Sequence, residues 1–290
     1  IETFGEKPYR ARQLMHWIYQ ESLIDFNEMT DISKVFRDVL KDKTTIEFPS
    51  VMSDALSDDG TRKWLFDVGG NNGIETVFIP EDDRGTLCIS SQVGCALECT
   101  FCSTGRQGFN RNLTTAEIIG QLWLANFYVR QQEGYNALSN SERIISNVVM
   151  MGMGEPLMNY NNVLKAISMI TSDEGLGMSP KRITLSTSGV PKMIKKLADD
   201  EVKFKLAVSL HSAIDEIRSR IMPFSANFPL ADLREALEYW YSKTKSKITY
   251  EYVVWKGIND NKESVDALVK FCKYVPCKVN LIEYNPIDDG

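Results

Sequence analysis

The chain has 290 residues, and its 43% hydrophobic and 25% charged content is typical of a soluble globular protein. This composition excludes a disordered chain, a collagen and a small disulfide scaffold, and no apolar segment approaches the roughly 18 residues that span a bilayer. A net charge of −6 argues against a protein whose whole surface attracts nucleic acid, although it is compatible with a local basic patch.

The first 48 residues are expected to form a small helical accessory domain. Residues 7–20 carry an apolar face at helical spacing and begin beside a proline, which favours the first turn of a helix. Residues 31–40 form a second short helical pattern, for which Asp31 or Thr30 would be the N-cap.

A β-hairpin extension is expected next, over residues 49–84. Residues 61–68 alternate between apolar and polar side chains, and residues 74–79 are rich in β-branched residues. The segment between them, residues 69–73, contains only glycine and asparagine, which favour tight turns.

Residues 85–290 show six strand patterns separated by helix patterns, which predicts a parallel sheet with crossover helices. Six units are too few for a closed eight-fold barrel. We therefore predict an α/β fold built as a partial (β/α)6 barrel, with a doubly wound open sheet as the alternative. The predicted strands are residues 86–93, 146–153, 182–188, 204–210, 248–254 and 278–284; the predicted helices are residues 114–129, 163–171, 191–198, 231–242 and 263–274.

The strongest chemical signal is a run of three cysteines, Cys95, Cys99 and Cys102, spaced C-x₃-C-x₂-C. Three thiolates on a short loop can hold three irons of a four-iron cluster and leave the fourth iron open to substrate. Zinc would need a fourth ligand, and the only histidines, His16 and His211, lie far from this loop in sequence. The alternatives are a zinc site with a remote fourth ligand, or three thiols that only pack in a hydrophobic core. Six cysteines are too few for a disulfide scaffold, and three of them within eight positions indicate metal chemistry in a reducing compartment, so we expect a cytoplasmic protein.

Residues suited to ligand binding follow several predicted strands, at the edge where α/β folds bind ligands. Gly154 would let the backbone approach a ligand closely, and Glu155 could pair with an ammonium group. Hydroxyl, imidazole and amide groups at the other strand ends would suit a ribose or a carboxylate. These strand-end residues are Ser186, Ser209, Leu210, His211 and Asn285.

The cysteine motif, with Phe101 before its last cysteine, resembles the signature of the radical S-adenosylmethionine (SAM) superfamily. Longer strings resemble the RlmN/Cfr family of radical SAM RNA methyltransferases, essentially from end to end. They are residues 4–11 (FGEKPYRA), 74–80 (IETVFIP), 88–95 (CISSQVGC), 108–113 (GFNRNL), 151–156 (MGMGEP) and 209–211 (SLH). The run at residues 107–112 resembles the RlmN branch, which methylates C2 of adenine, more than the C8-methylating Cfr branch.

This resemblance implies methylation of C2 of an adenosine in 23S rRNA and commonly also of an anticodon-loop adenosine in tRNA. The implied cofactors are a 4Fe-4S cluster on the three motif cysteines and S-adenosyl-L-methionine on Gly154, Glu155 and the five strand-end residues. In relatives, one SAM methylates a cysteine, and a radical made from a second SAM activates that methyl group for addition to adenine. Cys88 matches the cysteine that releases the product through a transient disulfide, and Glu75 matches the proton acceptor.

The same resemblance implies RNA bound with the help of the N-terminal domain, an electron donor such as flavodoxin or ferredoxin, no membrane, and a monomer. The methyl-carrying cysteine of relatives lies near the C-terminus in an Ala-Cys-Gly-Gln setting that is not found here, and Cys272 and Cys277, which do not fit it, are expected to be structural. We interpret this as a tail that is cleaved, mutated or disordered. A chain ending at Gly290 is expected to bind both cofactors without methylating RNA. A C8-methylating enzyme and a non-catalytic metal-cluster RNA-binding module are the alternatives.

Overall fold

The computed structural model describes residues 1–82, 84–132 and 143–287, which form two compact units. Unit 1 contains residues 1–87, 114–147 and 164–179, and unit 2 contains residues 88–113, 148–163 and 180–290. Each unit is described separately below. Among the described residues, no helix combines the length and apolar character that crossing a membrane requires.

The N-terminal part of unit 1 is helical, as predicted. Helix α1 (Tyr9–Met15) continues into a π-helical segment, η2 (His16–Gln20), and α2 (Lys34–Lys43) follows. The predicted N-cap of α2 is wrong, because Ser33 accepts the hydrogen bond from the backbone of Phe36. The Asp31 carboxylate is already occupied, since it accepts hydrogen bonds from the side chains of Trp17 and Gln13. A small core of this segment consists of Phe26, Met29, Ile32, Phe36 and Leu40.

The predicted hairpin of unit 1 is confirmed and is part of a larger set of strands. Strands β2 (Arg62–Asp67) and β3 (Gly73–Glu81) pair antiparallel, with Leu65 opposite Glu75. A further strand, β1 (Ser50–Leu56), pairs with β2 and was not predicted. Nearly all of its side chains are exposed, so its sequence shows no apolar alternation.

Helix α4 (Thr115–Arg130) of unit 1 begins at the capping box that its sequence contains. The Thr114 hydroxyl accepts the Glu117 N–H, and the Glu117 carboxylate accepts the Thr114 N–H at 2.8 Å. Helix α5 (Tyr160–Thr171) follows strand β7 (Ile145–Met150) in the chain.

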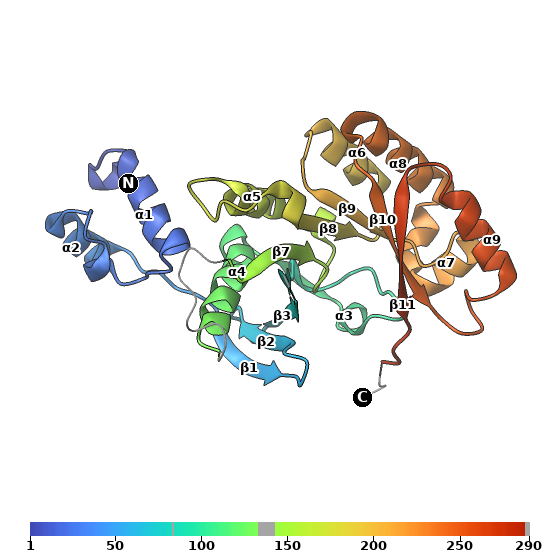
Figure 1. The fold of residues 1–290 in the computed structure, drawn as a ribbon, viewed down its shortest axis with the longest axis horizontal. Helices are drawn as coiled ribbons and strands as arrows, with labels where there is room; N and C mark the ends of the chain where they lie inside the picture. The colour runs from blue at the N-terminus through green and yellow to red at the C-terminus, as the bar shows by residue number, and fades with distance from the viewer. Residues whose placement is uncertain (83, 133–142, 288–290) are drawn as a thin grey trace. The chain divides into compact units, whose positions relative to one another are not determined.

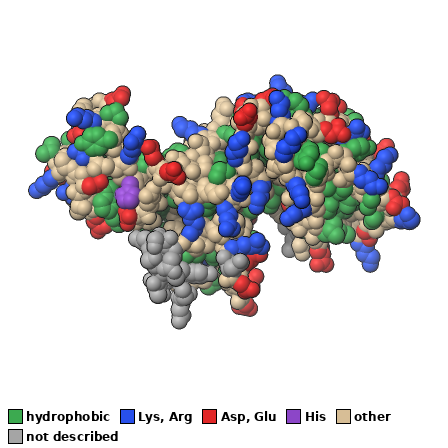
Figure 2. Space-filling model, turned by 45° about the horizontal axis from the view of Figure 1, so that its top comes forward, with side chains coloured by type: hydrophobic (Ala, Val, Ile, Leu, Met, Phe, Trp, Pro, Cys, Tyr) green, Lys and Arg blue, Asp and Glu red, His purple; other side chains and the backbone are tan. Residues whose placement is uncertain are grey.

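The face drawn in Figure 2 carries both positive and negative side chains. Lys and Arg are spread over it, and so are Asp and Glu, so neither sign of charge covers it alone.

Unit 2 is built on parallel strands that neighbour one another in chain order, from β7 to β11 (Figure 1). In a doubly wound sheet the strand order reverses, so this sequential order supports the predicted partial barrel. All carboxyl ends of these strands consequently lie at one edge. After β7, the strands are β8 (Ile183–Thr187), β9 (Lys205–Ser209), β10 (Ile248–Val254) and β11 (Cys277–Glu283).

The crossover helices of unit 2 cover a tightly buried sheet. Leu206, Val208 and Tyr250 are fully buried, as is Trp240 on α8. The observed helices are α6 (Pro191–Asp199), α7 (Asp215–Ile221), α8 (Leu230–Thr244) and α9 (Lys262–Phe271), together with the short α3 (Ser103–Arg106). Helix α7 was not predicted.

The predicted strand at residues 86–93 is two strands. Strand β4 (Arg84–Cys88) ends at Cys88, and β5 (Gln92–Gly94) pairs instead with β6 (Phe109–Asn112) in a separate antiparallel sheet. The backbone N–H groups of Ser91 and Gln92 both donate to the carbonyl of Met153, which redirects the chain between the two strands.

Candidate active site

The three motif cysteines of unit 2 line one cavity of about 240 Å³ at the carboxyl ends of the strands. Their loop is held at its first cysteine and again between Cys99 and Cys102. The Cys95 N–H donates to the Gly108 carbonyl at 3.0 Å, and the backbone and hydroxyl of Thr100 both donate to the Ile221 carbonyl at the end of α7. The loop is therefore ordered by the protein chain itself.

The thiols of this loop are in an environment that disfavours a free thiolate. Burial raises the pKa of Cys99 to about 12, with further contributions from neighbouring Cys102 and Cys95. Burial also raises the pKa of Cys95. An iron centre that binds the thiolates would supply the positive charge that the loop lacks.

The donor set fits a cluster better than zinc. Three thiols line the cavity, which is the number that a 4Fe-4S cluster with one open iron takes from the protein, whereas a closed zinc site needs four ligands. His211 also lines the cavity, but its Nδ1 accepts the Val253 N–H at 3.0 Å, so the proton sits on Nε2. Zinc bound to Nε2 would require the imidazole proton to sit on Nδ1, where it would face the Val253 N–H, which is also a donor.

His211 is fixed by the protein on all sides. It has a positive φ of 54°, it is 2% exposed, and burial lowers its pKa to about 3. The Asn259 amide donates to the carbonyls of both His211 and Val253 at 2.7 Å. The Phe101 ring meets the imidazole edge-on, 4.6 Å between centroids. The imidazole is thus a neutral donor through Nε2 beside the cysteine loop.

Glu155 lies at the cavity, but its carboxylate is already used inside the protein. One oxygen accepts the Leu157 N–H at 3.0 Å, and the other accepts the Ser188 N–H at 2.6 Å. The Thr187 and Ser188 side chains also hydrogen-bond to this carboxylate, and its burial raises its pKa. Glu155 therefore ties the loop after β7 to the end of β8.

The glycines before Glu155 also allow a close approach within the protein itself. A Cβ on Gly154 would lie 2.4 Å from the Cβ of Gln92, and one on Gly152 would lie 2.8 Å from the Ile89 carbonyl. Both glycines let this loop pack closely against the chain after β4. Gly154 lines the cavity as well, with a φ of 96°.

The other predicted cofactor residues are only partly brought together. Ser186 and Ser209 line the cavity at the ends of β8 and β9. Leu210 is fully buried, and its N–H donates to the Glu251 carbonyl, while Asn285 is exposed and bonds to the Glu283 carbonyl. Neither is among the residues that line the cavity.

The two predicted catalytic residues lie outside the cavity lining. Cys88 is a partly buried thiol at the end of β4. Glu75 belongs to unit 1, where its exposed carboxylate forms an ion pair with Lys63 at 3.0 Å.

Two charged residues of the site were missed from the sequence. Glu251, on β10, lines the cavity; burial raises its pKa, and the Asn280 amide donates to it at 2.7 Å. Arg218, on α7, is 1% exposed. It donates to the Ser188, Ser209 and Leu210 carbonyls at the ends of β8 and β9. Burial lowers its pKa to about 10, so it stays charged.

Comparison with known proteins identifies the family. The ribosomal RNA large subunit methyltransferase N-terminal domain matches residues 1–46, and the radical SAM superfamily matches residues 89–272. The probable dual-specificity RNA methyltransferase RlmN of Flavobacterium johnsoniae is 59% identical over 286 residues, which cover 99% of this chain and 80% of that protein. The protein of the same name from Flavobacterium psychrophilum is 60% identical over 285 residues, covering 98% and 80%. The chain belongs to the RlmN family of radical SAM RNA methyltransferases.

A solved structure agrees with this assignment to the RlmN family. A radical SAM methyltransferase from Sphaerobacter thermophilus has a TM-score of 0.90 and 36% identity, covering 98% of this chain and 81% of that one. The predicted family, fold class and enzyme class are confirmed. As an RlmN-family enzyme, the protein works with SAM and a 4Fe-4S cluster.

Proposed function

We propose that the enzyme methylates C2 of adenosine-2503 in 23S rRNA and of adenosine-37 in tRNA. The observation that carries the proposal is the cavity of unit 2, which places three cysteine thiols beside polar strand ends. C2 of adenine is an electrophilic amidine carbon without an acidic proton, so a polar methyl transfer cannot reach it. Radical chemistry can.

In this proposal Cys95, Cys99 and Cys102 hold the cluster, and Ser186, Ser209 and His211 contact SAM. When bound, the cluster supplies the one-electron reduction of SAM. The cavity supports this assignment because all six side chains line it. The neutral His211 offers an N–H donor from Nε2, which suits a hydroxyl or carboxylate oxygen of the ligand.

We assign the two acidic residues of the cavity different roles. Glu155 positions the ends of β7 and β8, because both of its oxygens accept hydrogen bonds from the protein. Glu251 is the better candidate to contact the cationic SAM, since its carboxylate lines the cavity and accepts a neutral amide donor, Asn280. Leu210 and Asn285 remain proposed SAM-contacting residues on the family resemblance alone.

Cys88 is proposed as the thiol that resolves the protein–RNA intermediate, and Glu75 as the proton acceptor. Residues 1–48 are proposed to help bind RNA, residues 49–84 to form a β extension, and residues 85–290 to form the catalytic domain. A flavodoxin or ferredoxin is proposed as the electron donor. We also propose that the protein is a cytoplasmic monomer.

Anaerobic iron and sulfide analysis tests the cluster assignment. Single alanine substitutions at Cys95, Cys99 and Cys102 should each remove most of the iron and the reductive cleavage of SAM, while Cys272→Ala should keep about four irons per chain. One zinc per chain and no SAM cleavage in the wild type would overturn the proposal. Mass spectrometry of rRNA and tRNA from a deletion strain complemented with the full-length gene then distinguishes 2-methyladenosine from 8-methyladenosine in each RNA.

A further inference from the structure

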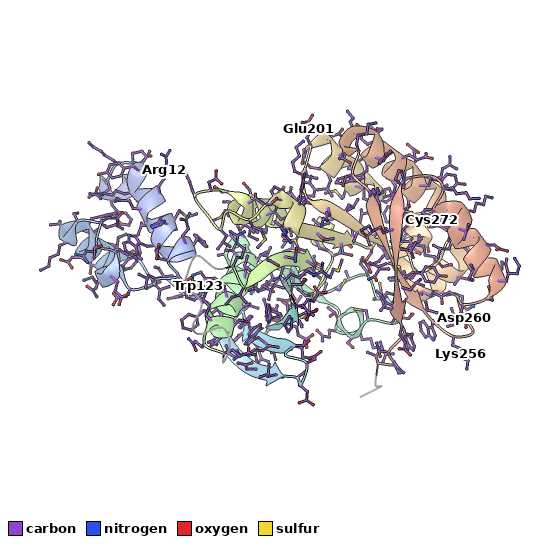
Figure 3. The ribbon with its side chains drawn as sticks, in the orientation of Figure 1. Arg12, Trp123, Glu201, Lys256, Asp260 and Cys272 are labelled. Carbon is purple, nitrogen blue, oxygen red and sulfur yellow. The ribbon has the colours of Figure 1, made fainter. Side chains whose placement is uncertain are left out.

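Two cysteines of unit 2 lie outside the cluster cavity. Cys272 is the C-cap of α9 and is labelled in Figure 3, and Cys277 is the first residue of β11. The Cys277 Sγ lies 3.5 Å from the carbonyl oxygen of Cys272, and both thiols are partly buried rather than enclosed. The two thiols therefore share one small, accessible site.

The backbone on both sides of this pair is anchored. The Cys272 N–H donates to Leu268 within the helix, and Cys277 faces Ile248 in the parallel ladder with β10. The Ile248 N–H also donates to the carbonyl of Pro276, directly before Cys277. The two thiols are thus held close together by hydrogen bonds that do not involve them.

We infer that Cys272 and Cys277 form a second redox site, in which a disulfide fastens the end of α9 to the start of β11. This inference does not depend on the proposed function. The pair lies at the amino end of β11, whereas the cavity lies at the carboxyl ends of the strands. Strand β11 has seven residues, so at about 3.3 Å per residue the two sites are roughly 20 Å apart.

The oxidant is a low-molecular-weight disulfide such as glutathione disulfide. One thiolate of the pair attacks it, forms a mixed disulfide and releases one glutathione. The second thiolate attacks the mixed disulfide, forms the Cys272–Cys277 bond and releases the second glutathione. Both cysteines are oxidised, the glutathione disulfide is reduced to two thiols, and the two cysteine protons pass to the products.

The surroundings indicate slow formation and slow reduction of this bond. Burial, with a contribution from the adjacent Cys277, raises the pKa of Cys272 to about 12. A thiol with a high pKa attacks slowly at neutral pH and is also a poor leaving group when its disulfide is attacked. Strongly oxidising disulfides are those whose reduced form is stabilised, and the burial of Cys272 gives its thiolate no such stabilisation.

Peptide mapping tests the inference on the cluster-loaded protein, kept free of oxygen and equilibrated with glutathione disulfide. Trypsin cleaves after Lys270, Lys273 and Lys278, so the disulfide would join residues 271–273 (FCK) to residues 274–278 (YVPCK). This linked peptide should become the major form of Cys277, and dithiothreitol should convert it to the two separate peptides. The absorbance of the cluster should not change.

Two serine variants provide the controls. Cys272→Ser and Cys277→Ser should each lose the linked peptide and free the remaining cysteine for alkylation. The oxidised wild type should melt about 2–6 °C above the reduced protein, and neither variant should show this shift. Three results would overturn the inference: Cys277 carrying only glutathione, Cys277 linked to Cys88 or a cluster cysteine, or no thiol lost.

Discussion

The backbone N–H of Val253 donates to Nδ1 of His211 at 3.0 Å, and this one bond determines which nitrogen of the imidazole carries the proton. Asn259 holds the carbonyls of the same two residues, so the orientation of the ring is fixed together with its tautomer. The cavity beside the cysteine loop is therefore lined by a histidine that is a hydrogen-bond donor at neutral pH.

Burial of His211 should make stability depend on pH. Its pKa is lowered to about 3 in the folded protein, whereas the unfolded value is about 6.5. Below pH 6.5 the histidine binds a proton in the unfolded chain but not in the folded protein. The free energy of unfolding therefore falls as the pH drops, by up to about 1.4 kcal/mol per pH unit. Urea unfolding at pH 7.5, 6 and 5 should show a weaker decline for His211→Gln than for wild type. His16→Gln, at an exposed histidine, should follow wild type, and parallel curves for all three proteins would contradict the prediction.

Gly94 and Gly108 offer a matched pair of substitutions, because both have a φ of 71°. A Cβ on Gly94 would lie 1.8 Å from the Gly108 carbonyl oxygen, whereas one on Gly108 meets nothing within 4 Å. Gly108→Ala should therefore cost about 1 kcal/mol of unfolding free energy, from the left-handed backbone alone. Gly94→Ala should cost at least about 3 kcal/mol and lower iron binding, because it displaces the neighbouring Cys95. Equal losses in the two variants, measured by urea unfolding, would refute the steric argument.

Arg218→Met should destabilise unit 2 by about 2–4 kcal/mol, because it removes the Arg218 donor from the partly buried carbonyls of Ser188 and Ser209 and one of two donors from the buried Leu210 carbonyl. Arg220→Met, an exposed position on the same helix, should change stability by less than about 0.5 kcal/mol. Denaturant unfolding gives both values. SAM affinity, measured by equilibrium dialysis, should fall only for Arg218→Met, and a wild-type affinity would show that the strand ends do not need this residue.

Glu251→Gln should make the cofactor-free protein more stable at neutral pH and weaken SAM binding. Burial raises the pKa of Glu251, so the folded state gains stability at low pH and loses it as the pH rises above about 4.5. The variant should be more stable than wild type at pH 7.5 and match it near pH 4. Its affinity for SAM should fall about tenfold if the carboxylate meets the cation. Glu263→Gln, on the exposed side of α9, should change neither quantity, and a Glu251 variant that binds SAM normally would remove this residue from the site.

The sequence predicted those features that depend on local patterns. The capping box at Thr114 joins residues three apart, and strand β10 was predicted with its observed ends, Ile248–Val254. The break after Cys88 depends instead on bonds from Ser91 and Gln92 to Met153, some sixty residues away, which no local pattern contains.

Glu251 and Arg218, the two site residues that were not predicted, differ in how clearly the sequence marks them. Glu251 is a single carboxylate within an apolar strand, which is a usable signal for a buried functional group. Arg218 has no such signal, because Arg220 stands two residues later in the same helix and is exposed. Only the packing of α7 against the ends of β8 and β9 separates these two arginines.

The base of the cysteine loop has a consequence for the life of the enzyme. Residues 94 and 109 pair across β5 and β6, and the Cys95 N–H donates to the Gly108 carbonyl. These backbone contacts close the loop between residues 95 and 108 without any metal. The chain therefore does not have to pay the entropy of closing this loop each time iron binds. A protein that loses its cluster to oxidation should keep its thiols in place, and delivered iron and sulfide can restore it without a round of refolding.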